Sequence, residues 1–249
     1  MLNRVVMVGG EKGAQESLAD EAVALGLSVA SLDSGATPPS GTACVIAETK
    51  NAKAALSACV NVAKHHNELL FLLGEAIDSR EDLQPGSSMR VMDCASRFGK
   101  SLHLSPEDQN TLERGALLRD IGKLRIPNSL LLKYTILTHD EWEAIRGHTH
   151  RGGDLVSVTA GLQDIENIVR FHHECWDGTG YPNGLERDEI PRLAQIVRLV
   201  DVFCAMTAPR HYRKNVHSTK DALDHLKSEA GKHFNGELVE AFLDAKIGK

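Results

Sequence analysis

HHECWDGTGYP, from His172 to Pro182, is the stretch of this sequence that decides most about its fold and its chemistry. Ile165, Ile168 and Val169 precede it at helical spacing, so we expect the paired histidines to end a helix. A glycine-rich loop follows them at once. Imidazole pairs at a helix end suit metal ligation, and glycine lets the backbone come close to a ligand. The stretch therefore predicts a metal site beside a ligand-binding loop.

Other polar residues lie on or beside apolar helical faces. Asp120 follows an apolar run, His148 lies one helical turn after an isoleucine, and Asp201 lies one turn after a valine. An ionised carboxylate beside a core face destabilises the fold unless it is paired or bound to a metal. One such residue is most often a satisfied core group, but a set drawn from several predicted helices indicates a metal or phosphate site. The set is Asp120, His148, His172, His173 and Asp201.

Composition narrows the class of protein. The 249 residues are 42% hydrophobic and 25% charged, as in ordinary globular proteins, and only 4% aromatic, which predicts an aliphatic core. The net charge of −6 argues against binding to duplex nucleic acid, and no apolar stretch approaches the length of a membrane span. The five cysteines are scattered without a CxxC pair, so neither a disulfide framework nor a zinc knuckle is expected. We predict a cytoplasmic protein.

The chain divides into two parts by its pattern. Residues 1–65 alternate short apolar runs with helical stretches, which predicts a small α/β module. The expected strands are 4–10, 27–32 and 43–47, and the expected helices are 14–25 and 52–64. Residues 66–249 predict an almost wholly helical domain, with helix starts at Ser105-Pro106, at Thr138 to Glu141 and at Asp188 to Pro191. The predicted fold class is mainly α, a helical bundle preceded by a small α/β module.

The run from His172 to Pro182 resembles the signature of the HD-GYP family, metal-dependent phosphodiesterases that act on cyclic dinucleotides, chiefly cyclic di-GMP. Three further segments resemble the family: ALLRDIGKLRIP at 116–127, RGHTHRGGDLV at 146–156 and LVDVFCAMTAPRHYR at 199–213. The resemblance covers roughly residues 68–247 and implies an all-helical bundle of the HD phosphohydrolase type. Residues 1–65 weakly resemble a truncated response-regulator receiver without its acidic residues, and we assign them a structural or dimerising role.

The resemblance assigns roles to individual residues. It implies that Asp120, His148, His172, His173 and Asp201 ligate one or two divalent metals, with His150 as an alternative to His148. Mixed imidazole and carboxylate ligands favour iron or manganese, with zinc as an alternative. Asp120 and Lys123 would act in catalysis. The residues implied to contact the nucleotide are Lys123, Gly180, Tyr181, Pro182, Arg210 and Arg213.

Arg119 departs from the family, which places a histidine there in a His-Asp pair. A guanidinium has no lone pair to give to a metal. Its side chain could swing aside and leave an incomplete ligand set. Alternatively it could pair with Asp120 and replace a cation, in which case the domain could lack metal altogether. The family also usually carries Asp at Cys204, where a thiolate ligand or a buried structural cysteine are the two alternatives.

Two hypotheses follow for a bacterial signalling protein. The first is a metal-dependent phosphodiesterase acting on cyclic di-GMP or a related cyclic dinucleotide, with catalysis impaired by Arg119. The second is an inactive module that binds the dinucleotide or docks a protein partner through the loop around Gly180 and Tyr181. A homodimer is compatible with both hypotheses, and the metal content of the protein would separate them.

Overall fold

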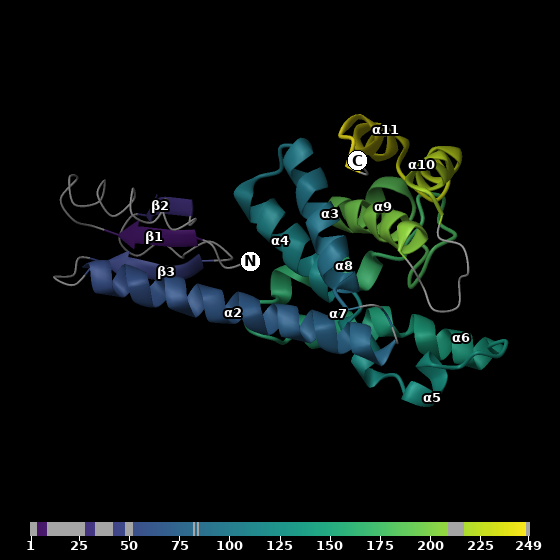
Figure 1. The fold of residues 1–249 in the computed structure, drawn as a ribbon, viewed down its shortest axis with the longest axis horizontal. Helices are drawn as coiled ribbons and strands as arrows, with labels where there is room; N and C mark the ends of the chain where they lie inside the picture. The colour runs from purple at the N-terminus through teal and green to yellow at the C-terminus, as the bar shows by residue number, and fades with distance from the viewer. Residues whose placement is uncertain are drawn as a thin grey trace. The chain divides into compact units, whose positions relative to one another are not determined.

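The computed structural model describes residues 4–8, 28–32, 42–47, 52–81, 83, 85–208 and 217–247, with side chains from residue 65 onward. The chain forms two compact units, Met1–Leu70 and Phe71–Lys249 (Figure 1). Helix α2, Ala52–Arg80, runs through the boundary between them. The predicted domain boundary after residue 65 falls inside this helix, and the division into domains 1–65 and 66–249 stays a prediction.

The first unit contains a parallel sheet in the strand order β2-β1-β3. Strand β1 is Arg4–Val8, β2 is Ser28–Leu32 and β3 is Thr42–Ala47. The three strands lie where the apolar runs predicted them. The predicted helix 14–25 lies outside the described residues, so the α/β module as a whole stays a prediction. The predicted helix 52–64 is the start of the longer helix α2.

All secondary-structure elements found among the described residues of the second unit are helices, which confirms the predicted all-helical bundle. Its helices after α2 are α3 (Ser87–Ser101), α4 (Pro106–Leu118), α5 (Asn128–Leu131), α6 (His139–Arg146), α7 (His148–Ser157), α8 (Glu166–Phe171), α9 (Arg192–Thr207), α10 (Thr219–Ser228) and α11 (Gly236–Asp244). Short 3₁₀ helices are Ile121–Arg125, Gln163–Ile165 and Arg187–Glu189. Among the described residues, no helix is both long enough and apolar enough to cross a membrane.

Helix starts follow the capping signals of the sequence. Ser105 accepts a hydrogen bond from the Asp108 amide at 3.0 Å and starts α4, and Thr138 and Glu141 form a reciprocal capping box that starts α6. The predicted start at residues 188–191 instead falls in a 3₁₀ turn, and α9 begins after Pro191. The apolar spacing did not reveal that α6 and α7 are separate helices that meet at Gly147.

The core of the second unit is aliphatic with a small aromatic centre. Phe242 of α11 contacts Phe98 of α3 edge-on at 5.0 Å between ring centroids, and Phe203 of α9 at 5.2 Å. Around them pack buried side chains of α3, α4, α8, α9, α10 and α11. Each fully buried large side chain contributes about 1.5–3 kcal/mol. This core fixes α4 and α8, which Asp120 and His172 follow, and α9, which contains Asp201.

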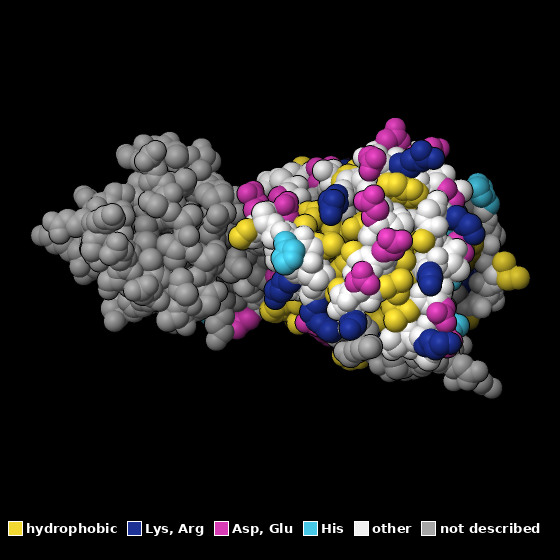
Figure 2. Space-filling model, turned by 90° about the horizontal axis from the view of Figure 1, so that it is seen from above, with side chains coloured by type: hydrophobic (Ala, Val, Ile, Leu, Met, Phe, Trp, Pro, Cys, Tyr) yellow, Lys and Arg dark blue, Asp and Glu magenta, His cyan; other side chains and the backbone are white. Residues whose placement is uncertain are grey.

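Acidic and basic side chains mix over the face of the second unit drawn in Figure 2, with hydrophobic side chains between them. The net charge of −6 is therefore not gathered into one acidic patch on that face. A ligand that carries negative charge needs a local cluster of basic side chains. Two largely buried basic side chains, Arg119 and Lys123, lie at and just after the end of α4, each paired with carboxylates.

Candidate metal centre

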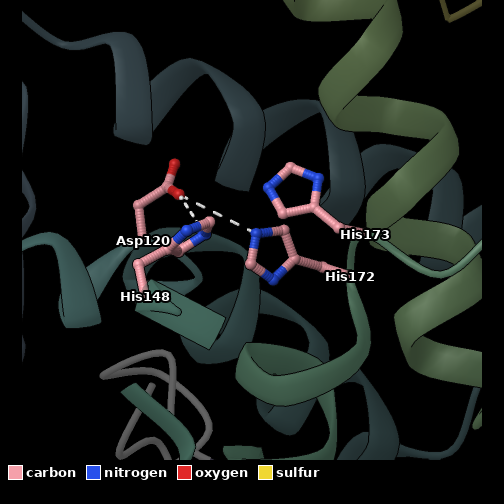
Figure 3. A group of neighbouring side chains, drawn as sticks. All are labelled: Asp120, His148, His172 and His173. Carbon is pink, nitrogen blue, oxygen red and sulfur yellow. Dashed lines mark ion pairs between the residues drawn. The ribbon is translucent and has the colours of Figure 1, made fainter. Parts of the chain in front are cut away.

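Three helices bring together four side chains of the types that can ligate a metal. Asp120 follows the end of α4, His148 is the first residue of α7, and His172 and His173 follow α8. One donor atom from each of the four lies within 4.8 Å of all the others (Figure 3). Four of the five ligands predicted from the sequence thus meet in one place, although their role as ligands stays a prediction.

Glycine permits the close approach that places these residues. A Cβ atom added to Gly122 would lie 1.9 Å from the carbonyl oxygen of His148, and one on Gly152 would lie 3.0 Å from the Gly122 amide nitrogen. The turn after Asp120 therefore packs directly on the backbone of α7. Any side chain at Gly122 would push α7 and His148 away from Asp120.

The histidines present unprotonated nitrogens to the centre. His148 Nδ1 lies 2.8 Å from the Ile145 carbonyl oxygen, and His172 Nδ1 lies 3.0 Å from the Val169 carbonyl oxygen. A carbonyl only accepts hydrogen bonds, so each Nδ1 carries the proton and each Nε2 of a neutral ring has a free lone pair. Both Nε2 atoms are buried and have no hydrogen-bond partner among the described residues. They lie 3.3 Å and 3.8 Å from Asp120 Oδ1.

The charge states of these groups suit a cation. Burial lowers the pKa of His172, and burial together with the neighbouring His172 holds the pKa of His173 well below its usual value. Burial acts to raise the pKa of Asp120, but Lys123 and Arg119 outweigh it and hold that pKa well below its usual value. Near neutral pH His172 and His173 are therefore neutral imidazoles and Asp120 is a carboxylate, the forms that bind a metal.

Arg119 lies on the other side of Asp120. Its Nε donates to Asp201 Oδ1 at 2.8 Å, its Nη1 donates to the Ala116 carbonyl oxygen at 3.0 Å, and its Nη2 lies 3.3 Å from Asp120 Oδ2. Burial opposes the charge on Arg119, but Asp201 and Asp120 outweigh it and raise its pKa. Of the two arrangements that the sequence left open, the structure has the one in which the guanidinium pairs with Asp120.

Asp201 is accordingly not in the converging group. It was predicted as the fifth ligand, but its carboxylate faces the guanidinium of Arg119 and not the three imidazoles. The physical reason is that Arg119, buried among apolar side chains of the bundle, needs carboxylate partners to keep its charge. Only a rearrangement of Arg119 would free Asp201 for a metal.

Lys123 is held by two carboxylates. Its Nζ lies 3.0 Å from Asp120 Oδ1 and 2.9 Å from Glu81 Oε1. Burial opposes the charge of Lys123, but Asp120 and Glu81 outweigh it and raise its pKa above the usual value. Lys123 was predicted from the sequence to act at this site. Its contact with Glu81, which lies just after α2, could not be predicted from the spacing of residues in the sequence.

The glycine-rich loop packs against the same histidines. The ring of Tyr181 stacks on His173 with 4.7 Å between centroids, and the Arg146 guanidinium lies 5.2 Å from the Tyr181 centroid. A Cβ atom on Gly180 would lie 2.2 Å from the Cys175 amide nitrogen, so only glycine fits there. The loop thus places Tyr181 beside the centre.

Glu174 holds this loop in place. Its Oε1 accepts a hydrogen bond from the Asn183 amide at 2.7 Å, and its Oε2 accepts one from the Leu185 amide at 3.2 Å. The carboxylate is buried and faces backbone amides, so Glu174 positions the loop and is not one of the converging donors. Sequence reasoning missed this role because its partners are main-chain groups, which leave no signature in the residue types.

A family model described as HD domain matches residues 72–238. The chain belongs to the HD domain family, in its HD-GYP branch. The cyclic di-GMP phosphodiesterase of Thermotoga maritima is 36% identical over 178 residues, which are 71% of this chain and 48% of that protein. The 3'3'-cGAMP-specific phosphodiesterase 2 of Vibrio cholerae is 30% identical over 187 residues, covering 74% of this chain and 36% of that protein.

A solved structure of a cyclic GMP-AMP-specific phosphodiesterase of V. cholerae has the same fold as this HD domain. Its TM-score is 0.56 at 20% sequence identity, over 71% of this chain and 47% of that one. The chain spans between about a third and a half of the length of the curated relatives named above. HD domains are metal-dependent, and Asp120 with the three histidines is a group among the described residues that could hold a metal.

The remaining predicted residues lie in four different places. His150, the alternative to His148, is exposed and its Nδ1 lies 3.1 Å from Arg170 Nη1, away from the centre of the HD domain. Pro182 follows Tyr181 in the loop, through a cis peptide bond. Arg210 and Arg213 lie outside the described residues. Cys204 is buried in the core and is not among the converging donors, in keeping with the structural alternative for that position.

Proposed function

We propose that this HD domain is a metal-dependent phosphodiesterase of cyclic dinucleotides that binds one divalent metal, with Arg119 in the place of a second cation. One observation carries the proposal: Asp120 faces free imidazole nitrogens on one side and a buried guanidinium on the other. The relatives named as phosphodiesterases of cyclic di-GMP and of 3'3'-cGAMP support the substrate class.

The donor set supports the choice of metal. Three imidazoles and one carboxylate suit iron or manganese, and also zinc, better than magnesium, which prefers oxygen ligands. A bound divalent metal would supply Lewis-acid polarisation of a phosphate oxygen. Asp120, His148, His172 and His173 would hold it. Because the two orphaned Nε2 atoms are buried, a cation there would also remove the cost of leaving them without partners.

The chain's own cations would bind and orient the substrate. Lys123 lies against Asp120 at the edge of the donor group, where its ammonium can neutralise charge that develops on a phosphate. Arg119 supplies a positive charge beside Asp201 without giving a lone pair. Tyr181 places a ring next to His173, where it can contact the ligand. We assign Arg210 and Arg213 the same phosphate-binding role on the family resemblance.

We expect slow hydrolysis for an electrostatic reason. A guanidinium supplies about one unit of positive charge where a second divalent metal would supply two, and it cannot polarise an oxygen by coordination. Substrate binding needs only the charge, whereas the chemical step also needs the polarisation. The proposed enzyme therefore retains affinity for the dinucleotide and loses rate.

A second candidate function is an inactive binding module. The observation in its favour is that Arg119 already pairs with both Asp120 and Asp201. Such a module would bind the dinucleotide, or a protein partner through the loop around Tyr181, without turnover. The cytoplasmic location, the α/β module over residues 1–65 and the homodimer are proposals that apply to either function.

The test is metal content measured on anaerobically purified full-length protein, together with hydrolysis of cyclic di-GMP and 3'3'-cGAMP. Iron(II) or manganese(II) is added in separate reactions, and His172→Ala serves as the inactive control. We expect one equivalent of metal and slow, metal-dependent hydrolysis that the variant lacks. Metal with dinucleotide binding but no hydrolysis would establish the binding module instead. Protein that takes up no metal under any of these conditions would overturn the proposal.

A further inference from the structure

Two cysteines meet between helices α3 and α9, on the side of α9 that faces the core. Cys94 of α3 and Cys204 of α9 are both buried in the hydrophobic core cluster. Both side chains form part of the wall of one cavity, which brings them to the same place between the two helices. Cys204 Sγ also lies 3.9 Å from the carbonyl oxygen of Arg90, one helical turn before Cys94. Neither cysteine takes part in the metal centre, because the donor group contains no sulfur.

A cavity of about 290 Å³ leads to this pair. Cys94 and Cys204 form part of its wall, and the exposed residues Arg90, Asp93 and Arg97 of α3 stand around it. The space far exceeds the roughly 30 Å³ that a water molecule occupies in the liquid. A small solute can therefore reach sulfur atoms that are otherwise covered by the core.

The two thiols are electrostatically unequal. The hydrogen bond from Cys204 lowers the pKa of Cys94 against the effect of burial, and the nearby Arg97 lowers it further. The same hydrogen bond raises the pKa of Cys204, and burial adds to the rise. Cys94 is thus the thiol with more thiolate character, and thiolate is the reactive form of cysteine. Cys204 remains a protonated neighbour in the wall of the same cavity.

We propose that Cys94 and Cys204 are a site of reversible oxidation, at which a hydroperoxide converts the two thiols into a disulfide that links α3 to α9. The Cys94 thiolate attacks one peroxide oxygen, the O–O bond breaks, and the leaving oxygen departs as water or alcohol after taking up a proton. Cys94 is then a sulfenic acid. The Cys204 sulfur attacks it, the S–O bond breaks, and a second water leaves with the Cys204 proton. The thiols lose two electrons and the peroxide gains them.

Cys175 provides the matched control within the same unit. It is also buried, and its Sγ accepts a hydrogen bond from Arg198 Nη2 at 3.5 Å. It therefore has a cationic neighbour, as Cys94 does. Among the described residues it has no cysteine beside it, so it offers no resolving thiol. Cys175 and Cys94 are thus both buried near an arginine, and they differ in that only Cys94 has a second thiol beside it.

The experiment oxidises the reduced full-length protein with hydrogen peroxide under native conditions. Remaining thiols are then blocked, and the protein is digested without reductant for mass spectrometry. We expect a linked Cys94–Cys204 peptide pair that forms before Cys175 is modified and that disappears with dithiothreitol. In Cys204→Ser, dimedone should trap sulfenic acid on Cys94. In Cys175→Ser, the cross-link should form at the unchanged rate.

Two results would overturn the proposal. One is wild-type protein in which Cys94 and Cys204 stay free while Cys175 oxidises. The other is a disulfide that forms only after the protein is unfolded, which would show that the folded geometry does not bring the sulfurs together. The disulfide mapping by mass spectrometry of the wild-type protein does not depend on the variants, so it remains a test even if a variant fails to fold. The result is independent of whether the metal centre hydrolyses a dinucleotide.

Discussion

The two sides of Asp120 differ in their chemistry: one consists of imidazole donors and the other of ion pairs. On one side His148, His172 and His173 offer lone pairs, and two of their nitrogens are buried without a partner among the described residues. On the other side Arg119 pairs with Asp201 and Asp120, and every charge has an opposite charge beside it. We propose that an external cation completes the donor side. The ion-paired side is complete as it stands, because its cation is a side chain.

This difference shows how arginine in place of histidine at position 119 changes the site around Asp120 while its other residues keep their arrangement. A histidine beside Asp120 would add a donor, whereas Arg119 adds a permanent charge at the same backbone position. Asp201 then has a partner in the absence of metal, so α9 and α4 remain joined. The donor side is untouched, because its geometry depends on the carbonyl contacts of the imidazoles and on the close approach at Gly122.

Removal of the charge at Arg119 should have the largest effect. In Arg119→Gln, Asp201 loses its ion pair and Asp120 keeps Lys123 as its cationic partner, within a largely buried environment. Loss of one partner from a buried pair costs about 3 kcal/mol or more. We expect the metal-free variant to lose about that much free energy of unfolding in urea denaturation. A variant as stable as the wild type would show that the ion-paired side contributes nothing to the fold.

Arg119→His sharpens the same comparison, because it replaces a cation with a donor. We expect this variant to bind a second equivalent of iron or manganese and to hydrolyse cyclic dinucleotides faster than the wild type. It should recover the stability lost in Arg119→Gln only when metal is present. Arg119→Gln is its control, since it removes the charge without adding a ligand. A histidine variant that still binds one metal would contradict the idea that Arg119 stands in for a cation.

On the donor side, removal of an imidazole should abolish tight metal binding. Changes to residues that merely support a ligand cost about 10–100-fold in metal affinity, so His148→Ala and His172→Ala should each cost at least about 100-fold. His150→Ala is the matched control, because His150 is on the same helix as His148 but exposed and outside the centre. Calorimetric titration with manganese(II) measures the metal affinity of all three variants. Equal losses in all three variants would place the metal elsewhere.

Much of the donor side could be predicted from the sequence, and the reason is local. His148, His172 and His173 lie at helix ends with apolar residues one turn away, so their direction follows from helical periodicity. The starts of α4 and α6 follow from capping residues within four positions of each other. Each of these features depends on neighbours in the chain.

The ion-paired side could not be predicted to the same degree, because its partners are far apart in the chain. Arg119 and Asp201 are separated by 82 residues, and Lys123 and Glu81 by 42. Charged residues such as these are equally compatible with a solvated surface until the fold brings them together. The family resemblance flagged Arg119 as a departure and left two arrangements open. Only the packing of α4 against α9 distinguishes them.

The donor side should also make the stability of the metal-free protein depend on pH. His172 and His173 have folded-state pKa values lowered from 6.5, so the unfolded chain takes up protons first as the pH falls. Stability is therefore full above about pH 6.5 and is lost progressively below it. The lowered pKa of Asp120 acts in a separate window, because its contribution is lost only as the pH falls below 3.8. Urea unfolding with a chelator at pH 7.5 and 5.5 measures the first window.

The control for this pH effect is a variant that cannot take up the proton. His173→Gln should flatten the loss of stability between the two pH values, whereas His150→Ala should leave it unchanged because that ring is exposed in the folded protein. Chelation matters because a bound metal would compete with protons for the same nitrogens. A wild-type protein whose free energy of unfolding stays constant across this range would show that the imidazoles are not buried in solution.

The smallest effect should come from Tyr181, which touches only the donor side. Its ring stacks on His173 at 4.7 Å and so limits the directions that the imidazole can face. Such a contact contributes about 0.5–1.5 kcal/mol, so Tyr181→Ala should weaken manganese binding by up to about tenfold. Tyr181→Phe keeps the ring and should bind metal as the wild type does. If both variants weaken binding equally, the hydroxyl and not the stack orients His173. If neither variant weakens manganese binding, the end of its own helix fixes the His173 imidazole, and the loop that contains Tyr181 does not contribute to metal binding.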